Sequence, residues 1–203
     1  MSARTKRIAQ IKRVTGETNI ALWLDLDGGG KSSIATGIPF FDHMLTLFGK
    51  HALFDLDVRA KGDTEVDFHH TVEDVGIVLG QVLAKALGDK KGMVRYGNIL
   101  LPMDETLVRV ALDFSGRPLL VWRLPKGVNL NRLKAGDFPA QLTVEFLRGF
   151  VQQAGLTLHV EVLYSDETHH LIEAVFKGLA RALEQAVRRD TRVKGIPSTK
   201  GVL

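Results

Sequence analysis

The chain has 203 residues, of which 45% are hydrophobic and 25% charged, and its formal net charge is +4. These values are typical of one folded domain or of two small fused ones, and they exclude a disordered chain. Because there is no cysteine, disulfides, thiolate zinc sites and cysteine nucleophiles are excluded, and any metal site must use His and carboxylate ligands.

The first half of the chain predicts the order strand, helix, strand, helix. Alternating apolar residues indicate a strand over residues 19–27, which ends in a triple-glycine turn. Pro39 opens a helical pattern, and we expect Gly49 to close it. Residues 51–60 alternate again, and over residues 69–87 apolar side chains recur at helical spacing.

The second half repeats this order after additional strands. Strands are predicted at 98–103, 106–114, 118–124 and 156–163, and helices at about 139–154 and 168–188. Both halves end in helix, strand, helix. We interpret the chain as a single domain over residues 1–203 with two similar halves, about 12–92 and 93–190, and a tail at 191–203.

The motif His-His-x-x-Glu begins the last helix of each half, at residues 69–73 and 169–173. On a helix, either histidine shares a face with the glutamate. The two adjacent histidines, however, differ by about 100° around the helix axis and can hardly both reach one ion. The repeated motif therefore predicts two metal positions, with adjacent histidines directed at different ions. Ligands from a neighbouring subunit are needed if one chain cannot close both sites.

One further metal-competent side chain lies on the first helix of each half. His43 precedes His69 by 26 residues, and Glu145 precedes His169 by 24. A single His pair at a helix start is often a surface or capping feature, but the repeated motif is much harder to explain in that way. Imidazole with carboxylate suits Mn, Fe, Co, Ni or Zn better than Mg or Ca.

Several basic side chains are candidates for phosphate binding, although each alone is better explained as a solvated surface charge. Lys177 stands out because it lies one helical turn beyond Glu173. By pattern alone, Glu17 is an ordinary exposed acid. The full set of phosphate candidates is Arg95, Arg117, Lys177 and the tail residues Ser198, Thr199 and Lys200.

The sequence is less consistent with two other classes of function. A non-catalytic metal-storage or di-iron protein also uses Glu and His pairs on helices, but those proteins are helical bundles without alternating strands. A nucleic-acid-binding module needs a clustered basic stripe or stacking aromatics, and only 7% of the residues are aromatic. No apolar run approaches the ~20 residues of a membrane span, and no signal segment is evident. We therefore expect a cytoplasmic protein without membrane or nucleic-acid partners.

Three segments resemble imidazoleglycerol-phosphate dehydratases: GIPFFDHML at 37–45, DFHHTVED at 67–74 and HHLIEAVFK at 169–177. The resemblance extends over nearly the whole chain. It implies a hydro-lyase of histidine biosynthesis that converts D-erythro-imidazole glycerol phosphate to imidazole acetol phosphate. The implied fold is α/β (α+β), with duplicated half-domains that are each a sheet backed by helices (ribosomal protein S5 domain 2-like). The implied assembly is a 24-subunit homo-oligomer with two Mn²⁺ ions per active site at subunit interfaces.

The resemblance also implies roles for individual residues. Glu17 matches the acid/base glutamate of the family, and Glu173 is an alternative for proton transfer. Glu145 falls where some members carry His, and Thr46-Leu47 replaces a polar pair of some relatives. The implied metal ligands are His43, His69, His70, Glu73, Glu145, His169, His170 and Glu173. The implied substrate contacts are Glu17, His43, Arg95, Arg117, Lys177, Ser198, Thr199 and Lys200.

Overall fold

The computed structural model describes residues 6–203, so the first five residues of the predicted domain lie outside it. The helices are α1 (Pro39–Ala52), α2 (His69–Leu87), α3 (Leu142–Ala154) and α4 (Thr168–Val187), with a short 3-10 helix at Leu130–Arg132. The strands are β1 (Ile8–Val14), β2 (Thr18–Asp25), β3 (Ser32–Ala35), β4 (Asp55–Gly62), β5 (Tyr96–Met103), β6 (Thr106–Asp113), β7 (Leu119–Arg123), β8 (Lys134–Ala135), β9 (Phe138–Pro139) and β10 (Thr157–Tyr164).

The two halves have the same topology, which confirms the predicted duplication. One sheet has the strand order β1-β2-β4-β3 and the other β5-β6-β10-β7. In each sheet the last pair in this order is parallel and the other pairs are antiparallel. The parallel pairs need a crossover, which α1 provides in the first half and α3 in the second.

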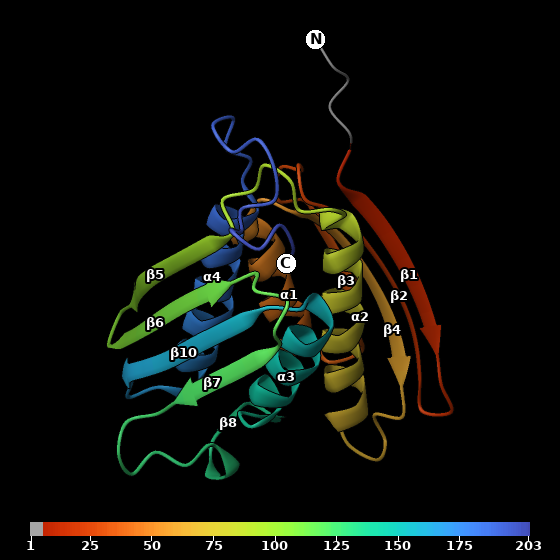
Figure 1. The fold of residues 1–203 in the computed structure, drawn as a ribbon. Coiled ribbons are helices and arrows are strands. Elements are labelled where there is room, and N and C mark those ends of the chain that lie inside the picture. Colours follow the sequence, from red (N-terminus) through yellow and green to blue (C-terminus); the bar gives the residue numbers. More distant parts are fainter. Residues whose placement is uncertain (1–5) are drawn as a thin grey trace.

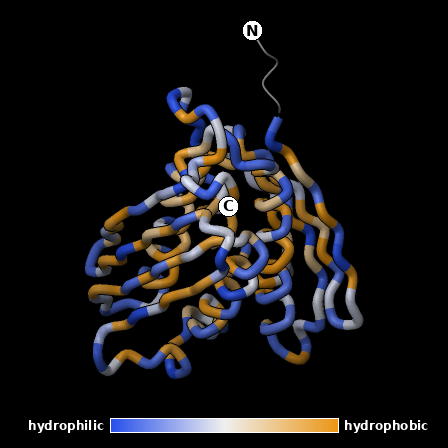
Figure 2. Tube along the Cα trace, viewed as in Figure 1, coloured by the Kyte–Doolittle hydropathy of each residue, from blue (hydrophilic) through white to orange (hydrophobic). Residues whose placement is uncertain are grey.

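The four helices lie between the two sheets (Figure 1). Helix α1 packs along α4, and α2 packs along α3, so each helix pair joins the two halves. Hydrophobic and hydrophilic residues alternate along the strands of both sheets (Figure 2), because one face of each sheet is covered by helices and the other is not. The core between the sheets is aromatic around Phe146, whose ring centroid lies 5.1 Å from that of Phe176 and 5.6 Å from that of Phe41.

Two boundaries of the first half differ from the prediction. Gly49 does not close α1, which continues to Ala52 and ends at Leu53 in a left-handed conformation with φ 58°. A Cβ at Gly49 would lie 2.3 Å from Ser32 Oγ, so this glycine permits a close contact inside the helix. The strand expected from residue 51 therefore begins only at Asp55.

Three further differences concern short or edge elements. Strand β1 was not predicted because basic side chains interrupt its apolar alternation, and β3 has only four residues. Pro139, expected near the start of a helix, lies in β9, and α3 begins at Leu142. The bounds of α2 agree with the prediction. Among residues 6–203, no helix has the length and apolar character required to cross a membrane.

Candidate metal centres and active site

The His-His-x-x-Glu motifs lie at the first turns of α2 and α4, and an acidic side chain fixes each helix start. Asp67 Oδ1 accepts the backbone N–H of His69 at 2.7 Å. Glu167 Oε2 accepts the backbone N–H of His170 at 2.7 Å. Both contacts satisfy amides that have no partner within the helix, so the imidazoles project from well-defined helix ends.

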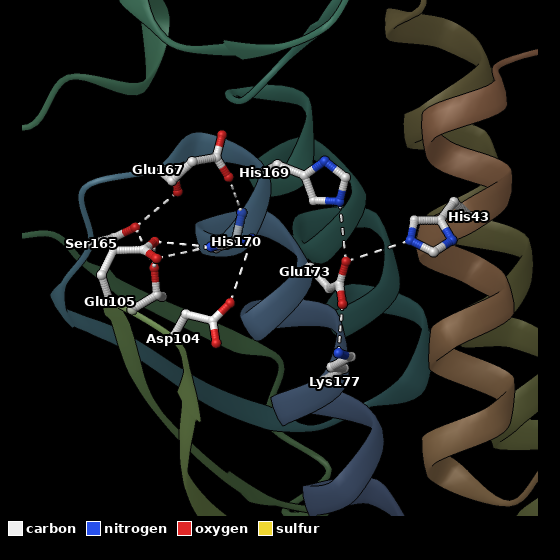
Figure 3. A network of polar contacts seen from close by, with 10 residues as sticks. His43, Asp104, Glu105, Ser165, Glu167, His169, His170, Glu173 and Lys177 are labelled. Carbon is white, nitrogen blue, oxygen red and sulfur yellow. Dashed lines mark hydrogen bonds and ion pairs between the residues drawn. The ribbon is translucent and has the colours of Figure 1, made fainter.

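The first group of candidate ligands, called the α1–α4 cluster below, consists of His43, His169 and Glu173. Glu173 Oε2 lies 3.2 Å from His169 Nε2 and 3.5 Å from His43 Nε2 (Figure 3). One donor atom from each residue lies within 4.8 Å of the others. Lys177 Nζ contacts the other oxygen of Glu173 at 2.5 Å. A residue from the first half thus completes a cluster on the last helix of the second half.

The carboxylate of Glu173 is only 8% exposed. Burial alone would raise the pKa of Glu173, but the hydrogen bond from Lys177 and the nearby His169 and His43 outweigh it and lower the pKa below its ordinary value. The group therefore stays ionised and available as a ligand at neutral pH.

The equivalent side chains of the other half, called the α2–α3 cluster below, are His69, Glu73 and Glu145, which are arranged less closely than the first group. The place of this cluster in the repeat is equivalent, because His43 and Glu145 each lie ten residues before the left-handed residue that ends their helix. His69 Nε2 lies 3.4 Å from Glu73 Oε2. Helix α3 approaches α2 closely here, since a Cβ at Gly149 would lie 2.9 Å from the Glu73 carbonyl oxygen.

Glu145 is held by its own helix. Gln141 Nε2 donates to Oε1 at 2.9 Å, and Arg148 Nη1 contacts the two carboxylate oxygens at 2.8 and 2.9 Å. Burial alone would raise the pKa of Glu145, but these hydrogen bonds and the nearby charges of Arg148 and His69 lower it. Glu145 is therefore ionised beside His69.

The second histidine of each motif faces other carboxylates. His70 Nδ1 lies 2.9 Å from Asp63 Oδ2, and its Nε2 lies 3.7 Å from Glu17 Oε1. His170 Nδ1 lies 3.0 Å from Glu105 Oε2. Hydrogen bonds to Asp63 and to Glu105 raise the pKa values of His70 and His170 respectively. Adjacent histidines are therefore directed to different neighbours, with interplanar angles of 89° in α2 and 78° in α4.

Glu17 lies in the tight turn between β1 and β2, which brings it next to α2. Thr15 Oγ1 accepts the backbone N–H groups of Glu17 and Thr18, so the turn is fixed by contacts that do not use the Glu17 side chain. In the second half the corresponding β5–β6 turn carries Glu105. Each sheet thus presents a glutamate to the second histidine of its own half.

Most phosphate candidates lie together at the other end of α4. The backbone N–H of Arg95 donates to the Ala186 carbonyl near the end of this helix. The Arg95 side chain forms a bidentate ion pair with Asp113 and donates to the Pro197 carbonyl at 2.8 Å. The tail residues Ser198, Thr199 and Lys200 follow directly.

The chain end joins the same region. A Cβ at Gly116 would lie 2.7 Å from the Leu203 backbone, so the chain end passes beside Arg117. Lys177 lies apart from this group, against Glu173 in the α1–α4 cluster. The phosphate candidates therefore form two groups within one chain.

Several neighbours of the candidate ligands were missed from the sequence. His51 was expected in a strand but lies on α1, where burial and the charges of Lys177 and Arg181 lower its pKa. It adds a third basic side chain beside the α1–α4 cluster. Gln141 and Arg148 lie four residues before and three after Glu145, and this helical spacing would have identified them.

The donor sets fit a transition-metal ion. The α1–α4 cluster offers two imidazoles and a carboxylate, and the α2–α3 cluster offers one imidazole and two carboxylates. Such nitrogen and oxygen donors suit Mn²⁺ and its first-row neighbours. Each cluster supplies three side chains, which leaves coordination positions for a further protein ligand and for substrate.

The chain is similar to known proteins along nearly its whole length. A match to the Imidazoleglycerol-phosphate dehydratase family covers residues 36–183. The imidazoleglycerol-phosphate dehydratase of Azorhizobium caulinodans is 59% identical over 198 residues, 97% of this chain and 98% of that protein. The enzyme of that name from Acetivibrio thermocellus is 57% identical over 194 residues, 96% of this chain and 97% of that protein.

Solved structures show the same similarity. The crystal structure of the Staphylococcus aureus imidazoleglycerol-phosphate dehydratase matches with a TM-score of 0.78 at 43% identity, and the match covers 90% of this chain and 99% of that one. The chain therefore belongs to the imidazoleglycerol-phosphate dehydratase family.

Proposed function

We propose that this hydro-lyase of histidine biosynthesis uses two Mn²⁺ ions per active site to dehydrate D-erythro-imidazole glycerol phosphate to imidazole acetol phosphate. The observation that carries the proposal is the convergence of His43, His169 and Glu173 on one place. The equivalent His69–Glu73 pair at the start of α2 supports a second site. When bound, the ions would supply Lewis-acid polarisation of the imidazole ring and of the leaving hydroxyl.

The separation of the two basic groups supports an active site shared between subunits. Glu173 and Ala186, which mark the metal cluster and the Arg95 region, are 13 residues apart on α4. At 1.5 Å per residue they are separated by about 20 Å along the helix. A three-carbon phosphate ester is far shorter than this. One chain therefore binds the reacting end of a substrate while another chain supplies Arg95, Arg117 and the tail at 191–203.

The second histidines support the same assembly. His70 contacts Asp63 and His170 contacts Glu105, and we infer that each histidine completes a cluster in a neighbouring subunit. We propose that the complete assembly is the 24-subunit homo-oligomer that the family resemblance implies. A cytoplasmic location, which suits an enzyme of amino-acid biosynthesis, is part of the same proposal.

The reaction breaks one C–H and one C–O bond, and the resulting enol tautomerises to the ketone. Glu17 is proposed to transfer the proton, because its carboxylate lies near His70 at an exposed position that a substrate can reach. Glu173 is less suited to this role because Lys177 and two histidines already engage it. Lys177, which contacts Glu173 in the α1–α4 cluster, is proposed to contribute to substrate binding from this chain.

The proposal is tested with metal-stripped protein that is assayed for ketone formation from imidazole glycerol phosphate, with and without added Mn²⁺. We expect turnover only with the metal, and loss of bound manganese in His70→Ala and His170→Ala variants. Equal turnover without metal from assembled protein would overturn the metal-dependent function.

A further inference from the structure

The two candidate metal clusters hold their carboxylates in different ways. In the α1–α4 cluster, Lys177 engages only Oε1 of Glu173, at 2.5 Å. The other oxygen faces His169 at 3.2 Å and His43 at 3.5 Å. One carboxylate oxygen is thus already directed, together with two imidazoles, at the place where an ion would bind.

In the α2–α3 cluster, Glu145 takes the place that His43 has in the other cluster, and both of its carboxylate oxygens are already engaged. Arg148 Nη1 lies 2.8 Å from Oε1 and 2.9 Å from Oε2 of Glu145, and Gln141 also donates to Oε1. Both oxygens therefore have a cationic partner. An ion that coordinates Glu145 must share these oxygens with Arg148, whose positive charge opposes the binding of a cation.

The surroundings add to this difference. Glu73 is 42% exposed, whereas its counterpart Glu173 is 8% exposed. The position that corresponds to Lys177 in the first half is Ile77, so no lysine at this place orients Glu73. An exposed, untethered side chain loses more conformational freedom when it is fixed on an ion. Preorganised side chains therefore favour metal binding at the α1–α4 cluster over the α2–α3 cluster.

We propose that the two metal sites are unequal, and that Arg148 is a positioning residue that competes with the metal for Glu145. The α1–α4 site binds its ion tightly, and the α2–α3 site is the weaker one. When metal is scarce, each chain then holds one ion rather than two, so metal supply controls the fraction of complete active sites. This inference rests on the proposed function, in which both clusters bind metal.

The experiment counts manganese per chain in the assembled enzyme over a series of chelator-buffered free Mn²⁺ concentrations, by inductively coupled plasma mass spectrometry. For the unmodified protein we expect two separate midpoints. Arg148→Gln is expected to move the weaker midpoint to lower free Mn²⁺, by up to about fivefold, the ratio that corresponds to ~1 kcal/mol for an exposed ion pair. Glu145→Gln is expected to remove the weaker class and keep the tighter one.

Arg109→Gln is the matched control. Arg109 is 58% exposed and pairs with Glu161 at 2.9 Å, whereas Arg148 is 60% exposed and pairs with Glu145 at 2.8 Å, and Arg109 lies on a strand away from both clusters. It should leave both midpoints unchanged. A single midpoint for two ions, or a weaker midpoint that Arg148→Gln does not move, overturns the inference and leaves the metal-dependent function intact. Failure of the unmodified protein to bind any manganese overturns the proposed function itself.

Discussion

Replacing Glu17 by Gln tests whether this carboxylate transfers the proton. The side chain is 57% exposed, and its Oε1 lies 3.7 Å from His70 Nε2. The β1–β2 turn is held by Thr15 and Thr18, so the free energy of unfolding should change by no more than ~0.5 kcal/mol. The amide has the same shape but cannot accept a proton at neutral pH. Loss of general acid–base catalysis is expected to lower kcat by about 10²–10⁴-fold.

The assay follows ketone formation under saturating substrate, with manganese content and assembly size measured on the same samples. KM and metal content should stay close to those of the unmodified enzyme, because Glu17 is not among the cluster residues. Glu161→Gln, the same change on strand β10, controls for the substitution and should keep full turnover. If Glu17→Gln retains turnover within about threefold, Glu17 does not carry the proton.

Three other changes have defined outcomes. Arg95→Lys removes the bidentate geometry at Asp113 and should raise KM for the substrate about tenfold with unchanged manganese content. Gly76→Ala places a Cβ 2.4 Å from the Phe146 carbonyl oxygen between α2 and α3, and calorimetry should show a loss of about 1–3 kcal/mol. The hydrogen bond from Arg192 lowers the pKa of Asp190 from 3.8 to about 2. The contribution of the Asp190–Arg192 ion pair to stability is therefore present above about pH 4, and it is lost as the pH falls towards 2. Asp190→Asn should remove this part of the acid dependence of unfolding.

Local sequence patterns predicted the elements that carry the metal motifs. Helix α2 begins and ends as its apolar spacing indicates, because a long amphipathic helix between two sheets has one consistent periodicity. The contact between Lys177 and Glu173 follows from helical spacing alone. Gly49 shows where such rules fail. Glycine commonly ends a helix, but Gly49 lies inside α1, where it allows a close contact with Ser32. Only the tertiary packing distinguishes a helix-ending glycine from one that permits such a contact.

Contacts between distant segments were not available from the sequence. Glu17 meets His70 because the β1–β2 turn lies at the end of the sheet where α2 begins, and the 52 intervening residues contain no local signal of this contact. The fold also determines the separation of the phosphate candidates into two groups. Arg95 and Lys177 belong to the same predicted phosphate set, yet the length of α4 separates them.

The duplicated fold makes each metal cluster depend on both halves. His43 comes from the first half and meets His169 and Glu173 of the second, while Glu145 from the second half faces His69 of the first. A half-domain alone carries its His-His-x-x-Glu motif but lacks the third side chain of its own cluster. The packing of α1 on α4 and of α2 on α3 therefore fixes the core and the ligand geometry together. A substitution that loosens these helix contacts, such as Gly76→Ala, should then weaken metal binding as well as stability.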